Sequence, residues 1–198
     1  MQYTLLSLVM LALFSSCGDL SNQGDPNEAC DGKDYCHIFI SSSTTKGNLA
    51  ASGSGIDEAD AICTASKPAN TGTVKAFLSD GTNRVACTSA DCSGGIGEHI
   101  DWVLAANREY RRPGGAVVIG TTDAFGIFGF PLLSEFYSSA GTIFTGMTTD
   151  YRPANDCTNW TSTLGTGTNG VLDSKLSNAL SSADNSCNNT HHILCVEQ

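Results

Sequence analysis

The sequence predicts an α+β, disulfide-rich exported domain with mixed or antiparallel sheets, one or two helices and long loops. Only 15% of its residues are charged, whereas glycine, serine, threonine and asparagine are abundant. This balance is typical of loop-rich secreted proteins and not of helical bundles. Nine cysteines indicate covalent cross-links between short apolar segments that are separated by polar loops.

Length and charge argue against several classes of function. The 198 residues suffice for one domain of ordinary size and a tail. A formal net charge of -10 argues against binding to nucleic acid, because the phosphates need lysine and arginine partners. It also argues against adhesion to an anionic membrane surface. The acidic balance favours solubility and identifies no specific partner.

The N-terminal residues are typical of a bacterial lipoprotein. An apolar run at residues 5–14 is too short to span a bilayer and is followed by Ser15, Ser16 and Cys17. We therefore expect a signal peptide at 1–16, lipidation at Cys17, a flexible tether at 17–29 and the domain at 30–198. No lysine or arginine precedes the run, so an ordinary signal peptide that is cleaved nearby is the alternative.

Removing Cys17 leaves an even number of cysteines, which predicts four disulfides in an exported domain. Two pairs are close enough in sequence to close small loops, namely Cys30 with Cys36 and Cys87 with Cys92. Spacing leaves the pairing of the other four open: Cys63, Cys157, Cys187 and Cys195. A metal site is the weaker alternative, because the chain has no Cys-x-x-Cys pair and no zinc-finger spacing of histidines.

One helix is predicted at residues 55–63. Apolar residues recur there at helical spacing, and Asp57 and Glu58 favour the positive N-terminal end of a helix. Cys63 should then face the core.

Strands are expected where short runs of β-branched and aromatic residues stand between turn signals. The runs are at 37–40, 73–78, 116–120, 142–146 and 193–196. A small hairpin at 30–36 should lead into the first of them. Residues 163–185, rich in glycine, threonine and serine, are interpreted as a long loop that disulfides hold in place.

Several motifs recur together in one order along the chain. They are HIFI at 37–40 with GNL at 47–49, ADAIC at 59–63, KAFLSD at 75–80, DCTNWTS at 156–162, SCN at 186–188 and LCVEQ at 194–198. Together they resemble a bacterial lipoprotein domain catalogued as domain of unknown function 1554, over about residues 36–198. That family is best known from spirochaete lipoproteins, and its fold resembles the C-type lectin and endostatin fold.

The resemblance implies a disulfide pairing. A C-type lectin-like domain ties a cysteine of its first helix to one of its last strand, and a second pair across its long-loop region. In this chain the pairs would be Cys63–Cys195 and Cys157–Cys187. An N-terminal bridge found in longer members would correspond to Cys30–Cys36.

The resemblance also implies a function that is not enzymatic. It suggests a lipid-anchored protein of the bacterial outer membrane or cell surface that adheres to host extracellular-matrix or serum proteins or to glycans. A passive envelope lipoprotein without a ligand is the alternative. An enzyme on a lectin-like scaffold is less favoured, because no Gly-x-Ser-x-Gly, phosphate loop or paired-histidine motif is present.

Candidate ligand-binding residues lie in three places. Arg108, Arg111 and Arg112 form the basic cluster of the chain, which suits a sulfated glycan or carboxylate unless local acids such as Glu109 satisfy it. Tyr151 and Arg152 are expected on an exposed loop. Trp160 either packs on the disulfide core or stacks on a sugar.

No cofactor or metal is expected. C-type lectins that bind sugar through calcium carry a Glu-Pro-Asn type triplet and a Trp-Asn-Asp triplet, and residues 153–156 and 184–186 match neither. Calcium takes about six to eight oxygen ligands, and these segments supply part of such a set. The neighbouring His191 and His192 point to opposite faces of a strand and do not chelate one ion well.

Overall fold

The computed structural model describes residues 29–50 and 53–198, which form an α+β fold with an eight-stranded mixed sheet and two helices. The expected signal peptide at 1–16, the lipidation site Cys17 and residues 17–28 of the tether lie outside the described residues. Within the described part of the chain, no helix has the length and apolar character needed to cross a membrane.

The elements follow one another along the chain with long loops between them. They are β1 (Tyr35–Ile40), α1 (Gly55–Ser66), β2 (Val74–Ala76), β3 (Glu109–Arg111), β4 (Val118–Thr121), β5 (Thr142–Phe144), α2 (Cys157–Trp160), β6 (Thr166–Val171), β7 (Ala183–Ser186) and β8 (His192–Glu197). Short 3-10 turns lie at Ala29–Gly32, Ala90–Cys92, Ile96–Glu98 and Ser177–Ala179.

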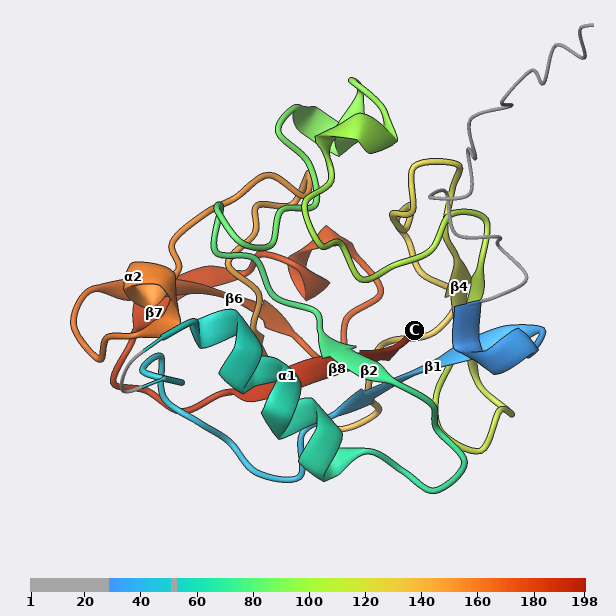
Figure 1. Cartoon of the computed structure of the whole chain (residues 1–198), viewed down its shortest axis with the longest axis horizontal. Helices are drawn as coiled ribbons and strands as arrows, with labels where there is room; N and C mark the ends of the chain where they lie inside the picture. Colours follow the sequence, from blue (N-terminus) through green and yellow to red (C-terminus); the bar gives the residue numbers. More distant parts are fainter. Residues whose placement is uncertain (1–28, 51–52) are drawn as a thin grey trace, which may run out of the picture.

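The last strand, β8, lies in the middle of the sheet (Figure 1). The strand order is β4-β3-β1-β8-β5-β6-β7, and β2 also pairs with β8. The pairs β1–β3 and β5–β8 are parallel, and the other pairs are antiparallel. The fold is therefore completed only when the C-terminal residues join strands from both halves of the chain.

The expected helix and the five expected strands are present, with ends that differ by a few residues. Helix α1 begins after Ser54, whose Oγ accepts a hydrogen bond from the Asp57 amide at 3.3 Å. It continues three residues past Cys63 to Ser66 and ends before Pro68. A residue that precedes proline avoids helical geometry, and Lys67 accordingly has an extended ψ of 136°.

Two sequence-based expectations are wrong. The hairpin at 30–36 is a 3-10 turn followed directly by β1, because Cys36 pairs with Tyr110 of β3 instead of folding back on the preceding residues. The loop at 163–185 contains strands β6 and β7, which pair with each other. The glycines of β6 allow close packing, since a Cβ on Gly170 would lie 1.9 Å from the Ala179 carbonyl oxygen.

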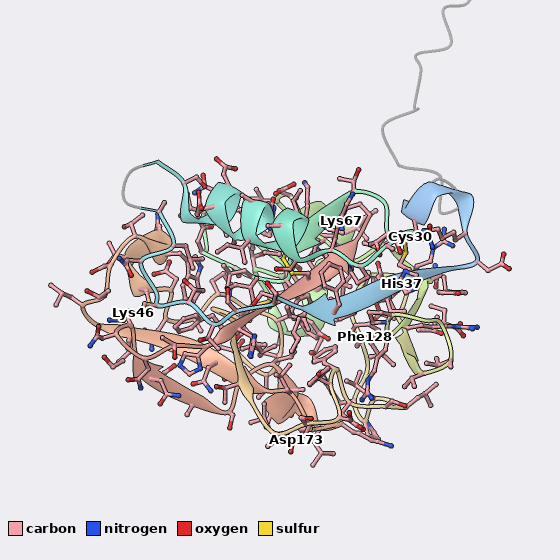
Figure 2. All side chains as sticks on the ribbon, turned by 90° about the horizontal axis from the view of Figure 1, so that it is seen from below. Cys30, His37, Lys46, Lys67, Phe128 and Asp173 are labelled. Carbon is pink, nitrogen blue, oxygen red and sulfur yellow. A yellow bond between two sulfur atoms is a disulfide. The ribbon has the colours of Figure 1, made fainter. Side chains whose placement is uncertain are left out.

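The sheet has a hydrophobic core on each face. Helix α1 covers one face, and residues such as Phe128 lie on the other (Figure 2). Phe39 of β1 packs under α1, whereas Ile38 belongs to the core on the opposite face. This alternation is what a strand that is buried on both sides requires.

Four disulfides hold these layers together. The Cys63–Cys195 bond ties α1 to β8, and the Cys157–Cys187 bond ties α2 to the residue after β7. The bonds Cys30–Cys36 and Cys87–Cys92 close short loops. These are the pairs that spacing and the family resemblance predict.

Candidate binding site

The three arginines of the basic cluster do not form one patch. The Arg111 guanidinium pairs with Glu109 at 2.6 Å and lies 4.2 Å from the centre of the Tyr35 ring. Arg108 is buried and donates from Nη1 to the Lys33 carbonyl oxygen at 2.9 Å. Its Nη2 has no hydrogen-bond partner among the described residues. The structure therefore has the alternative arrangement, in which Glu109 and other nearby groups of the protein bind the arginine side chains.

Tyr151 and Trp160 are core residues and present no ring to a ligand, which corrects the expectation of an exposed Tyr151. The Tyr151 hydroxyl donates to the Phe128 carbonyl oxygen and accepts from the Phe128 amide, both at 3.0 Å. Burial raises the pKa of this hydroxyl. Trp160 packs against Phe144 and donates from Nε1 to the Ser79 carbonyl oxygen at 2.9 Å. Arg152 is half-exposed and pairs with Asp150 at 2.8 Å.

Arg112 lies in the wall of a solvent-open cavity of about 350 Å³ at the edge of the sheet. We call this cavity the edge slot. Its walls come from residues 38–40 of β1, Ser66 and Pro68 at the end of α1, Arg112 and Pro113 after β3, and residues 136–138. The volume lies at the lower end of the range for small-ligand sites.

The edge slot exists because β3 is shorter than β1. The two strands pair only from Tyr35 with Glu109 to His37 with Arg111. The chain then turns, with the Arg112 amide donating to the Val117 carbonyl oxygen at 2.9 Å. Pro113 has no amide hydrogen with which to extend the ladder. The second half of β1 is therefore left without a strand on this side.

Arg112 fixes one wall of the edge slot. Its Nε and Nη2 donate to the Glu135 carbonyl oxygen at 3.1 and 2.6 Å, and Nη2 pairs with the Glu135 carboxylate at 2.9 Å. The hydrogen bond from Arg112 lowers the pKa of Glu135. These contacts hold the loop that carries Phe136 and Tyr137 against the end of β3. Phe136 is buried, whereas Tyr137 is 41% exposed at the rim.

Two of the residues weighed as calcium ligands, Asp184 and Asn185, make cross-strand bonds. Asp184 accepts a hydrogen bond from Thr168 Oγ1 at 2.6 Å, and Asn185 Nδ2 donates to Asn169 Oδ1 at 2.7 Å. These contacts join β7 to β6. Among the described residues, no group of three or more His, Cys, Asp or Glu side chains is placed to hold a metal ion.

His191 and His192 have separate partners. His191 Nδ1 lies 2.6 Å from Thr142 Oγ1, and its ring packs against Phe144. Burial lowers the pKa of His191. His192 Nδ1 lies 2.9 Å from the Ser41 carbonyl oxygen. Both rings thus serve the packing of the strand ends.

Most of the edge slot cannot be predicted from the sequence. Ile40 was expected only as a strand residue, and residues 136–138 carry no motif. Pro113 directly after a basic strand is the one signal that predicts an early end of β3. The other walls come from β1, α1, β3 and the 136–138 loop. These segments are far apart in sequence, so no local pattern predicts that they lie together.

The comparison with protein families matches residues 42–178 to a family described as protein of unknown function (DUF1554). A search of curated proteins finds no match.

Proposed function

Because the chain belongs to the DUF1554 family, we propose that it is an exported bacterial surface lipoprotein with a C-type lectin-like domain. This domain binds host extracellular-matrix or serum proteins, or glycans, without catalysing a reaction. Three observations support this proposal: the family match, the disulfide pattern and the edge slot.

The disulfide pattern supports the lectin-like assignment. The Cys63–Cys195 bond joins the main helix to the last strand, as in a C-type lectin-like domain. The Cys157–Cys187 bond spans the segment that contains the β6–β7 hairpin, at the place of the long-loop region. Fold alone does not define a ligand.

The observation that carries the binding function is the edge slot. Most large aromatic side chains of the domain are buried, yet Tyr137 and the apolar residues beside it line an open cavity. An apolar concave site with a few polar groups is the usual form of a binding site. A passive envelope protein has no need of such an opening.

Binding of the oxidised mature chain to immobilised matrix proteins, serum proteins and a glycan array tests the proposal. We expect saturable binding to at least one class, and loss of that binding after reduction of the disulfides. Adhesion of intact bacteria should fall when the gene is deleted. Unchanged adhesion, together with no saturable binding to any probe, would favour the passive envelope protein instead.

The lipid anchor gives a separate prediction, because Cys17 follows an apolar run and two small residues. Metabolic labelling with a palmitate analogue should mark the wild-type protein and not the Cys17→Ala variant. Protease treatment of intact cells should remove the domain, and leave the lipid label in the membrane, if the protein lies on the outer surface. A mature N-terminus beyond Cys17 would contradict the anchor.

A further inference from the structure

We propose that the edge slot binds an extended peptide segment, which adds to β1 as a further strand and places an apolar side chain in the cavity. This inference deepens the proposed binding function and rests on it. The partner would be a polypeptide that offers its main chain to β1 and one apolar side chain to the cavity.

The first step concerns the backbone of β1. The His37 amide donates to Glu197 Oε2 at 3.0 Å, and the Ser41 amide donates to the Ile193 carbonyl oxygen at 2.8 Å. Both amides therefore face β8. Because amide and carbonyl groups alternate between the two sides of a strand, those of Ile40 face away from β8 and towards the edge slot.

No described strand pairs with β1 at Ile40 on this side. The register with β3 ends where His37 meets Arg111, three residues before Ile40. An open strand edge offers a donor and an acceptor that match the main chain of an added strand.

The walls leave room where the next strand would run. Ser66 and Pro68 flank the opening on the side of α1, while Phe136 and Tyr137 flank it on the opposite face of the sheet. The turn at Pro113 closes the end nearest β3. The opening is thus a slot along the strand edge, with space for a short extended segment and one side chain.

The polarity of the walls favours a peptide over a saccharide. A sugar ring carries hydroxyl groups that need polar partners around it. The lining is mostly aliphatic, aromatic or proline, and the Arg112 guanidinium already binds Glu135. Beside the hydroxyl groups of Ser66, Tyr137 and Ser138, the Ile40 main chain offers the slot a paired donor and acceptor, and a peptide backbone is its direct complement.

The probe is a capped tripeptide, acetyl-Ala-Leu-Ala-amide, titrated into the ¹⁵N-labelled mature chain and followed by NMR. In the free protein the Ile40 amide should exchange with solvent much faster than those of Phe39 and Ser41. With peptide, the Ile40 resonance should move most, and its exchange should slow. A slowly exchanging Ile40 amide in the free protein would overturn the proposal.

Two peptide controls separate the parts of the interaction. Replacing the central leucine by alanine empties the cavity, and replacing its amide N–H by an ester oxygen removes one main-chain donor. The alanine peptide should bind at least about tenfold more weakly, and the ester about fivefold more weakly. Equal affinity of the ester for the same site would contradict strand addition.

A paired set of variants tests the location. Ser138 is exposed and lines the slot, so Ser138→Trp should fill it and abolish the Ile40 shift. Ser182 is an exposed serine outside the slot, and Ser182→Trp should bind the tripeptide as the wild type does. Unchanged spectra elsewhere in each variant would show that the fold is intact.

The outcomes distinguish this inference from the proposed function. If Ser138→Trp still binds a matrix protein or glycan and the tripeptide causes no Ile40 shift, the edge slot is not a peptide site, although the protein is a binding protein. A saccharide that shifts Ile40 where the tripeptide does not would likewise overturn the inference. If the tripeptide, the matrix proteins, the serum proteins and the glycans all fail to bind saturably, both proposals fail.

Discussion

Arg84 is a fully buried charge that joins three parts of the chain. Its Nη1 and Nη2 pair with the two carboxylate oxygens of Asp60 in α1, both at 2.8 Å. Nε donates to the Asp101 carbonyl oxygen at 3.0 Å, and Nη1 donates to that of Ala76 at 2.9 Å. The guanidinium therefore fixes α1 to β2 and to the segment before Trp102.

Replacing Arg84 by alanine should destabilise the fold by about 3 kcal/mol, because the buried Ala76 carbonyl oxygen and the partly buried Asp60 carboxylate then lose their donor. Urea unfolding measures the change. Arg152→Ala is the matched control, since that arginine pairs with Asp150 at the surface and should cost less than about 1 kcal/mol. Equal costs for the two variants would show that water replaces Arg84 in its site.

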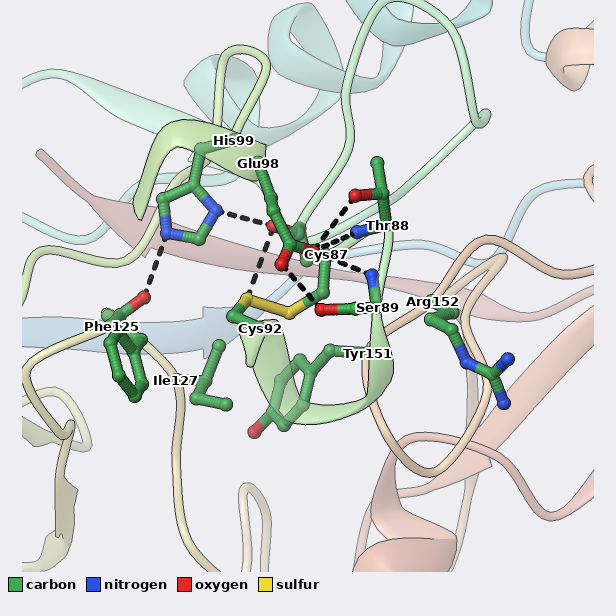
Figure 3. Close-up of a disulfide and its surroundings, with 12 residues drawn as sticks. Cys87, Thr88, Ser89, Cys92, Glu98, His99, Phe125, Ile127, Tyr151 and Arg152 are labelled. Carbon is green, nitrogen blue, oxygen red and sulfur yellow. Dashed lines mark hydrogen bonds between the residues drawn. A yellow bond between two sulfur atoms is a disulfide. The ribbon is translucent and has the colours of Figure 1, made fainter. Parts of the chain in front are cut away.

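Glu98 holds the disulfide-clipped loop together (Figure 3). Its carboxylate accepts hydrogen bonds from the hydroxyl and amide of Ser89, from those of Thr88, and from the Gly94 amide. The bonds from Ser89 are the main cause of a Glu98 pKa lowered to about 2 from 4.5.

Since the folded pKa of Glu98 is below the unfolded one, the carboxylate stabilises the loop fully above about pH 4.5 and loses this effect as pH falls to about 2. Hydrogen-exchange protection of the Ser89 and Gly94 amides should fall across this range. Glu98→Gln should show low protection at every pH. Protection that stays constant in the wild type from pH 5 to 2 would contradict this role.

At the residue scale, the sequence predicts which cysteines are bonded better than it predicts the hydrogen-bond partners of side chains. The cysteine pairs follow from spacing and resemblance, and the packing role of Trp160 follows from its place beside Cys157. Arg112 was placed in a ligand patch because its partner Glu135 lies 23 residues away. Tyr151 looked exposed in a polar loop, whereas its hydroxyl binds Phe128.

At the scale of elements, α2 is a left-handed turn that no local pattern predicts. Its four residues have φ between 54° and 59°, although none is glycine. Such a conformation costs about 1–2 kcal/mol per residue. The Cys157–Cys187 bond and the buried Trp160 ring hold it in place. Tertiary constraints, which lie outside the segment, therefore decide its shape.

Strand β6 escaped prediction for a related reason. Glycine and threonine are typical of loops, yet Gly167 lies where a Cβ would be 2.6 Å from Cys157 Sγ. The glycines serve packing against the disulfide and not turn formation. Strands such as β4 and β8 were predictable, because their β-branched residues favour a half-buried strand.

The disulfides should differ in their contribution to stability. In the loop-entropy treatment, the 132-residue separation of Cys63 and Cys195 corresponds to about 5 kcal/mol, and the 5-residue separation of Cys87 and Cys92 to about 2. Unfolding of the two double-alanine variants in urea tests the order. A larger loss for the short loop would show that chain entropy is not the main effect, and peptide mass spectrometry of the unreduced protein checks the pairing.

At the scale of the whole molecule, the two ends of the described chain meet at one end of the sheet. Glu197 of β8 pairs with Lys33 at 2.6 Å and with His37 of β1 at 2.7 Å. Ile40 lies at the other end of β1, about 10 Å from His37 at about 3.3 Å per residue. The wall of the edge slot begins beside this end, at Ile38, and follows β1 to Ile40.

The sequence predicts the fold class, but not the order and direction of the strands. Composition and cysteines indicate an α+β domain with disulfides, and the order of motifs indicates the family. The parallel pairing of β1 with β3 and of β5 with β8 joins residues that are far apart in sequence. The edge slot depends on this pairing and on its early end, of which Pro113 is the one local sign in the sequence.

Ligand binding by this domain should not require calcium. The ion takes about six to eight oxygen ligands, and a site with few carboxylates does not offset the cost of dehydrating it. In the segment between Cys157 and Cys187, Asp184 already accepts the Thr168 hydroxyl, and Asp173 is well separated from it in sequence. The β6–β7 hairpin thus uses its oxygens for cross-strand bonds.

Thermal melting with added calcium tests this expectation. The melting temperature should stay unchanged at micromolar calcium, and EDTA should leave binding to any matrix protein, peptide or glycan unaltered. Asp184→Asn keeps a side-chain oxygen that can accept from Thr168 but removes the charge, so its response to calcium should equal that of the wild type. A rise in melting temperature at micromolar calcium that Asp184→Ala abolishes would mean that the hairpin opens to form a calcium site, and that calcium-dependent sugar binding operates here.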